Sequence, residues 1–201
     1  MALKFVFTVV GACVFTEIVG YFIHILLHSN KIEFLSKNHM IHHLKVYQPK
    51  RGMRSADYLV STYGRAQVDG VGLEWLGPIA LILAAFFGAA YAFGMPLVLQ
   101  AVFVVAALLW GRFIFGVMHD AMHLESFWMA KNPLTRPWFL HVRKLHDIHH
   151  LSIEDDGRMT TNFGICFFFM DRLFGSLKTK MSSFNEKGYK TALERYAYIN
   201  A

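Results

Sequence analysis

Ten of the 11 histidines in this 201-residue chain fall into four short clusters. The clusters alternate between two and three members: His24 and His28; His39, His42 and His43; His119 and His123; His146, His149 and His150. Residues three or four apart share one face of an α-helix, so each cluster predicts a helix that points two or three imidazoles in one direction. Such a pattern constrains the fold strongly, because the four helices then have to meet.

The residue type predicts what the clusters do. Neutral imidazole is a common ligand for iron, zinc, copper and nickel. One histidine pair on a polar helix face is usually coincidence, whereas four matched clusters indicate a metal centre. Ten nitrogens exceed the four ligands of tetrahedral zinc and the six of an octahedral ion, so we expect two metals. Two irons are the preferred assignment, because an open all-nitrogen site suits oxygen activation, and two zincs are the alternative.

Composition places this centre in a membrane protein. The chain is 55% hydrophobic, with a mean hydropathy of +0.35. Residues 5–27, 73–93 and 97–118 each approach the roughly 20 apolar residues that cross a hydrocarbon core of about 30 Å. The first stretch runs directly into His24 without a small-residue cleavage site, which favours a retained anchor. The sequence predicts one all-α integral membrane domain over residues 1–201, with three transmembrane helices.

Charge predicts the orientation. Only Gly94, Met95 and Pro96 separate the second and third stretches, so these form a helical hairpin. Residues 29–72 hold seven Lys or Arg and residues 124–201 hold eleven, together 18 of the 20 in the chain. By the positive-inside tendency both segments are cytoplasmic and the N-terminus lies outside. This topology gathers all four clusters in a cytoplasmic helical cap, and it accounts for the basic charge without a nucleic-acid partner.

Two further features concern the membrane region. Residues 163–174 form an aromatic run too short to span, which predicts an interfacial or re-entrant segment. Glu17 and Arg112 each lie seven residues before the first histidine of a pair. Buried charges in a membrane usually find partners, so we expect an ion pair between them. The alternative is that Arg112 extends to the surface and Glu17 is protonated.

Other polar residues near the clusters are candidates for supporting roles. Asp120 and Asp147 adjoin ligand histidines and could orient an imidazole. Asp155, Asp156 and Asn162 follow the last cluster and could hold a histidine or a metal-bound water. His141 is five residues before His146, off the helical face, so we leave it out of the ligand set.

The order and spacing of the clusters, followed by Asn162-Phe163-Gly164 and then by Asp171 to Gly175, resemble the fatty acid hydroxylase and sterol desaturase superfamily of membrane di-iron enzymes. The resemblance implies a cytoplasmic di-iron site on a helical membrane bundle, with the ten clustered histidines as ligands. It also implies O2 as the oxidant and a lipid substrate that is hydroxylated, or desaturated as the alternative. The chain carries no haem extension, dinucleotide fingerprint or iron–sulfur cysteine set, so a ferredoxin or cytochrome-type donor is expected.

Two competing interpretations concern substrate and class. Bacterial beta-carotene hydroxylases are related, and Met118-His119-Asp120 and the last cluster are similar to theirs. Their first and third clusters usually have four intervening residues, against three here, and their tail lacks the 171–175 pattern, which favours an acyl or sterol-like lipid. A membrane metal transporter or sensor is the non-enzymatic alternative. Transporters place ligands near the bilayer midplane, whereas these clusters are expected at one side.

Overall fold

The computed structural model describes residues 2–48, 54 and 76–200. Within these ranges the chain is helical, and its one β-type pairing is an isolated bridge between Ile153 and Met159. The helices are α1 (Ala2–Leu27), α2 (Glu33–Ile41), η1 (His42–Val46), α4 (Leu76–Ala92), α5 (Leu97–Arg112), η3 (Phe113–Met118), α6 (His119–His123), α7 (Trp128–Lys131), α8 (Arg136–Leu151), α9 (Phe169–Phe174), α10 (Glu186–Arg195) and η4 (Ala197–Asn200). The predicted all-helical class is confirmed.

Two helices are long and apolar enough to cross a membrane. They are α1 and the continuous helix Leu97–His123, which joins α5, η3 and α6. The residues of the expected second span, 73–93, include α4, an apolar helix of 17 residues that is shorter than these two; positions 73–75 lie outside the described residues. Gly94, with φ of 64°, and Pro96, before the first turn of α5, form the tight connection of the hairpin.

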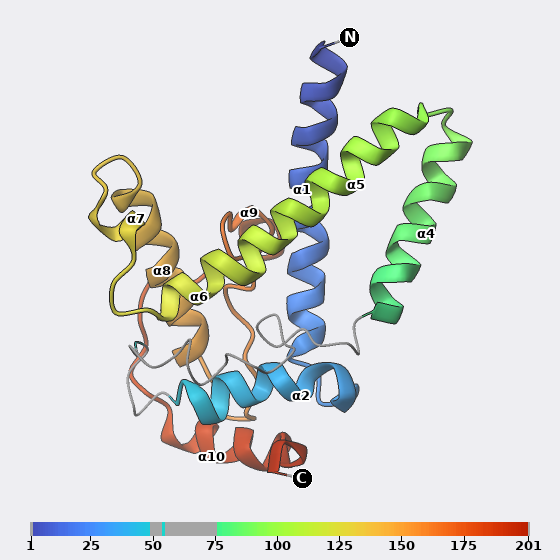
Figure 1. Cartoon of the computed structure of the whole chain (residues 1–201). Helices are drawn as coiled ribbons and strands as arrows, with labels where there is room; N and C mark the ends of the chain where they lie inside the picture. Colours follow the sequence, from blue (N-terminus) through green and yellow to red (C-terminus); the bar gives the residue numbers. More distant parts are fainter. Residues whose placement is uncertain (1, 49–53, 55–75, 201) are drawn as a thin grey trace.

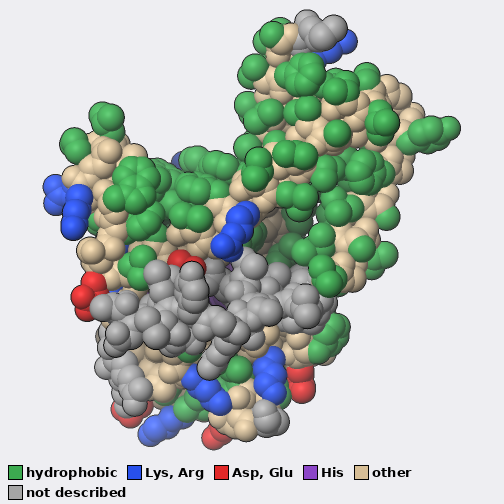
Figure 2. Space-filling model, viewed as in Figure 1, with side chains coloured by type: hydrophobic (Ala, Val, Ile, Leu, Met, Phe, Trp, Pro, Cys, Tyr) green, Lys and Arg blue, Asp and Glu red, His purple; other side chains and the backbone are tan. Residues whose placement is uncertain are grey.

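The long helices gather at one end of the molecule. In Figure 1, α1, α4 and α5 extend together on one side, α2 and α10 lie across the opposite end, and α7 and α8 form a lobe beside α6. Figure 2 shows hydrophobic side chains over α1, α4 and α5, whereas most visible charged side chains lie on the lower part and on the lobe. This division of surface fits apolar helices that sit in a bilayer and are joined to a more polar part outside it.

Close packing aligns the two long helices. A side chain on Gly20 of α1 would place its Cβ 2.7 Å from the ring of Phe115, so a larger residue would require the ring to move. The Thr16 hydroxyl donates to the Ala12 carbonyl within α1 at 2.8 Å and also lies 3.4 Å from the carbonyl of Ala107 on α5. Below the crossing, α1 ends at its first histidine pair and the second helix ends at the third cluster. The crossing therefore brings two clusters to the same level.

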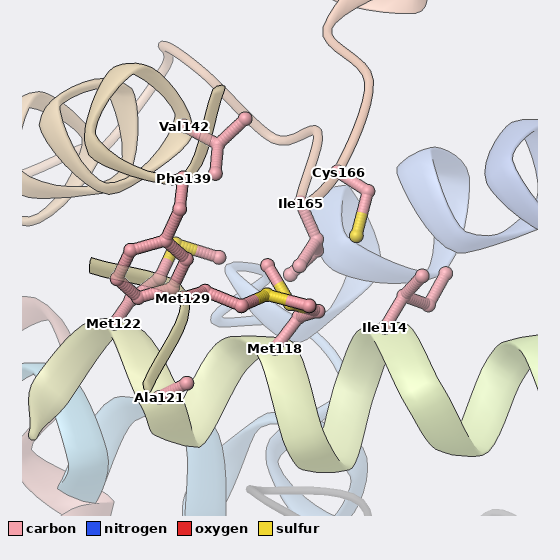
Figure 3. Packing of buried hydrophobic residues seen from close by; sticks show 9 residues of the cluster. All are labelled: Ile114, Met118, Ala121, Met122, Met129, Phe139, Val142, Ile165 and Cys166. Carbon is pink, nitrogen blue, oxygen red and sulfur yellow. The ribbon is translucent and has the colours of Figure 1, made fainter. Parts of the chain in front are cut away.

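An apolar core fixes α8 against the second long helix. Figure 3 shows Met118, Ala121 and Met122 on that helix opposite Phe139 and Val142 of α8, with Ile114, Met129, Ile165 and Cys166 completing the cluster. The fourth cluster lies on the same buried face of α8, one turn beyond Val142. Packing of the apolar residues thus determines where the last three histidines point.

The C-terminal helix α10 closes the cap from below. Gly157 adopts φ of +77°, and a Cβ there would lie 2.6 Å from the backbone nitrogen of Ala192 in α10. Tyr196, directly after α10, donates a buried hydrogen bond of 2.8 Å to the carbonyl of His28. The C-terminal segment after α10 therefore anchors the backbone of His28 in the first histidine pair.

We predict that Gly157→Ala destabilises the protein more than Gly175→Ala. Both glycines have a positive φ, which costs another residue about 1–2 kcal/mol, but the added methyl at Gly175 would meet nothing within 4 Å. The difference between the two thermal unfolding midpoints in detergent therefore measures the contact with α10. Equal midpoints would contradict this close packing.

Candidate metal centre

The ten clustered histidines form two buried groups of five. His24, His28, His39, His43 and His149 make the first group, and His42, His119, His123, His146 and His150 make the second. In each group one ring nitrogen per residue lies within 4.8 Å of the others. The groups are neighbours, because the rings of His43 and His150 stack with centroids 3.9 Å apart. The structure thus brings together every histidine of the predicted set and divides them equally.

Each three-histidine cluster serves both groups. The outer members of the second cluster, His39 and His43, belong to the first group, and the middle member His42 belongs to the second. The fourth cluster does the reverse: His149 joins the first group, and its outer members join the second. At 100° per residue, positions i and i+4 differ by 40°, while position i+3 is displaced by 60° and 100° from them. One helix can therefore supply ligands to two adjacent sites.

Wide helical turns accompany two of the clusters. η1 begins at His42, and η3 ends directly before His119. A π-type turn adds a residue to the repeat and changes the direction of the side chains around it, and such turns are frequent at functional sites. In this chain they lie next to His42 and His119, whose side chains both belong to the second group.

The imidazoles are held neutral by burial. Desolvation lowers the pKa of His149 to about 4, and it lowers the pKa of His39 and His43 well below the usual range of histidine. Neighbouring histidines lower the pKa values of His39 and His43 further, since a second positive charge nearby is unfavourable. Neutral imidazole is the form that binds metal.

Nitrogen spacing in the first group fits a bound cation. The Nε2 atoms of His149, His28, His39 and His43 follow one another at 3.1 Å. Ligands about 2.1 Å from a metal and at right angles to one another lie ~3.0 Å apart. His149 donates its Nδ1–H to a carbonyl, which leaves a lone pair on Nε2. That lone pair is available to bind a metal ion.

The second group has the same character. The Nε2 atom of His146 lies 2.9 Å from that of His123 and 3.1 Å from that of His150. Within the described part of the chain, both ring nitrogens of His119 are buried without a hydrogen bond. Unpaired buried nitrogens are costly, and metal coordination satisfies them. The residues of both groups therefore fit a metal ion each.

Backbone carbonyls orient two imidazoles of the first group. The Nδ1 of His24 donates to the carbonyl of Phe163 at 2.6 Å, and the Nδ1 of His149 donates to that of Thr161 at 2.7 Å. A hydrogen bond at one ring nitrogen fixes the tautomer and turns the other nitrogen toward the metal. The irregular segment after α8 is therefore part of the centre.

Asn162 and Asp171 hold this segment in place. Asn162, between the two carbonyls, has φ of 56°, and its amide donates to the carbonyls of Leu145 and Lys178 and accepts from the Lys178 N–H. Asp171 accepts from the N–H groups of Phe163 and Gly164. Sequence reasoning included Asn162 as a holder of a histidine or water; it acts instead on the backbone. Asp171 was missed, and its place in the tail pattern was the one signal for it.

The other supporting candidates are not members of the two metal groups. Asp147 forms a two-pronged ion pair with Arg54, at 2.6 and 2.8 Å. Asp120 is half-buried beside His119. Asp155 and Asp156 are exposed and pair with Lys187 and Arg158. His141 is exposed and belongs to neither group, as predicted.

The predicted ion pair between Glu17 and Arg112 is wrong. Glu17 accepts a 3.0 Å hydrogen bond from the indole of Trp110 and lines a cavity between α1 and α8. Arg112 lines a different cavity, between α1 and α4. Both residues lie two turns before a histidine, but they line different cavities and do not meet.

Comparison with known proteins agrees with this geometry. The model of the fatty acid hydroxylase family matches residues 9–176. The chain belongs to the fatty acid hydroxylase family. No curated protein and no solved structure matches the chain. The family match covers all four clusters and the orienting segment, and together with the two long apolar helices it indicates a membrane protein.

We predict that Asn162→Gly weakens metal binding in the first group. Glycine keeps the positive φ but removes the side-chain hydrogen bonds that place the Thr161 and Phe163 carbonyls. Loss of such an outer contact typically costs about 10–100-fold in metal affinity. Metal per purified chain, measured by elemental analysis during dialysis against a chelator, should fall from two toward one.

Asn185→Gly provides the control. Asn185 caps α10 by accepting from the Gly188 N–H, so its loss also destabilises the fold, but it touches neither carbonyl. Equal metal retention by the two variants would show that Asn162 acts only on stability.

Proposed function

We propose that this chain is a membrane di-iron oxygenase that hydroxylates an unactivated C–H bond of a lipid, fatty acyl or sterol-like. It uses O2 and electrons from a separate ferredoxin or cytochrome-type donor. The division of ten buried histidines into two groups of five supports this proposal most strongly. Membership of the fatty acid hydroxylase family supports the same chemistry.

The ligand count suits oxygen activation. Iron in both groups would supply the capacity to reduce O2 to the level needed to oxidise a C–H bond. Five nitrogen ligands leave one position of a six-coordinate ion for an exogenous molecule. The chain's own residues exclude water from the site, since His123, His146 and His149 are fully buried. Zinc is the alternative occupant, but it has no redox chemistry.

We place α1, α4 and the helix Leu97–His123 across the bilayer, with the histidine groups in a cytoplasmic cap and the N-terminus outside. The apolar surface of these helices and the excess of Lys and Arg in the other segments support this arrangement. A lipid substrate would then reach the cap from within the membrane.

A cavity beside the metal groups is suited to the hydrocarbon part of the substrate. It has a volume of about 530 Å³ and lies between α1, α5, α8 and the segment after Gly164. Val142 and Leu145 line it, one turn and one residue before His146. Glu17 and Trp110, which are joined by a hydrogen bond, also line it. A chain methylene fills roughly the ~30 Å³ of a water molecule, so one acyl chain of about 18 carbons fits.

The proposed activity is tested by two measurements. In purified protein loaded with iron, we expect two irons per chain. In cells that produce the protein, we expect mass spectrometry to detect a lipid product heavier by one oxygen atom. His42→Ala and His149→Ala each remove one ligand from a different group and should abolish the product. Metal flux into vesicles without oxygen consumption would overturn the proposal in favour of a transporter.

The cavity predicts a second effect on turnover. Val14 lines the cavity, whereas Val10, one turn earlier on α1, is 54% exposed and does not. Val14→Trp should lower kcat/KM by at least about tenfold, the equivalent of ~1.4 kcal/mol, with two irons retained. Val10→Trp should leave kcat/KM nearly unchanged. Equal effects of the two variants would exclude this cavity as the substrate site.

A further inference from the structure

A second cavity lies on the other side of α1. It has a volume of about 360 Å³ and is enclosed by α1, α4, α5 and η3. Its lining is apolar apart from Thr16 and Arg112. Representative apolar residues are Val19, Ile23, Ile82, Leu83 and Leu108. An apolar cavity among three membrane-type helices suits a hydrocarbon chain.

Among the described residues that line this cavity, Arg112 is the one with a charge. In the part of the chain that the structure describes, its guanidinium makes no ion pair, and Glu17 lies on the opposite side of the helix pair. Arg112 is exposed on its helix, and a cation on a membrane-type helix usually pairs with an anion or reaches the interface. The cavity thus combines an apolar interior with a positive charge that forms no ion pair with another described residue.

The position of Gly116 shows where this charge points. A Cβ on Gly116 would lie 2.4 Å from a guanidinium nitrogen of Arg112. The Arg112 side chain therefore folds along the helix toward its histidine-bearing end, across the space that the glycine leaves open. In the proposed topology this end faces the cytoplasm, so the guanidinium extends to the level of lipid headgroups, as long basic side chains do.

We propose that this cavity binds one chain of an anionic lipid, whose phosphate or carboxylate pairs with Arg112. A guanidinium forms two parallel hydrogen bonds with either group, which makes arginine well suited to both. By the same estimate of about 30 Å³ per methylene, the cavity takes roughly 12 methylenes of the chain. Binding here involves no metal ligand and does not depend on the proposed oxidation.

The two sources of such an anion are a bilayer phospholipid and a free fatty acid. The test uses delipidated full-length protein in a neutral detergent, with phosphatidylglycerol, phosphatidylcholine or oleate added separately. Thermal unfolding and native mass spectrometry report stabilisation and retained lipid. We expect phosphatidylglycerol or oleate, but not phosphatidylcholine, to raise the unfolding midpoint. The anion that gives the larger rise identifies the source.

Arg112→Gln should remove this selectivity, reducing the retained anionic lipid at least about tenfold, and Arg112→Lys should restore part of it. Arg136→Gln, which removes an exposed cation at the start of α8, is the matched control and should bind as the parent does. If Arg112→Gln unfolds, Leu83→Trp tests the chain-binding part by filling the cavity.

Equal retention of phosphatidylglycerol, phosphatidylcholine and oleate by the parent protein would overturn the proposal, as would unchanged retention in both Arg112→Gln and Leu83→Trp. Iron content and product formation are measured on the same samples. A chain that forms no hydroxylated lipid but retains the anionic lipid through Arg112 would contradict the proposed activity and leave this site intact.

Discussion

The convergence of ten neutral imidazoles on two small volumes is the constraint on which the rest of the structure depends. The Nε2 atoms of neighbouring imidazoles lie 3.1 Å apart in both groups, a spacing that suits nitrogens bound to one metal ion. Helix ends, wide turns and the irregular segment after α8 all serve this convergence. Apolar packing between α8 and the second long helix positions the ligands, while metal binding would compensate for their burial.

Much of this could be predicted from spacing and hydropathy, because both signals are local. Helical periodicity identified all ten histidines, and apolar length identified α1 and the helix Leu97–His123. The division into two groups could not be predicted, since it depends on how four helices cross. The carbonyls of Thr161 and Phe163 left no signal either, because any residue type supplies a carbonyl. Asp171 acts through the same irregular backbone, which has no periodicity.

The error over Glu17 and Arg112 has a similar cause. Seven residues are nearly two helical turns, so each charge does lie close to the face of the histidine that follows it. Spacing along one helix does not say on which side of a packed helix pair that face lies. In the structure Glu17 lines one cavity and Arg112 lines the other, so the two charges do not meet.

Sharing of the three-histidine clusters has a mechanical consequence for the centre. The helical segment with His39, His42 and His43 supplies ligands to both groups, and so does α8 with His146, His149 and His150. A rotation of either segment would move ligands of both groups at once, because the side chains are fixed to one backbone. The stacked rings of His43 and His150 add a direct contact between the groups. The two groups are therefore coupled through their shared segments, so that a change in the position of one group would be transmitted to the other.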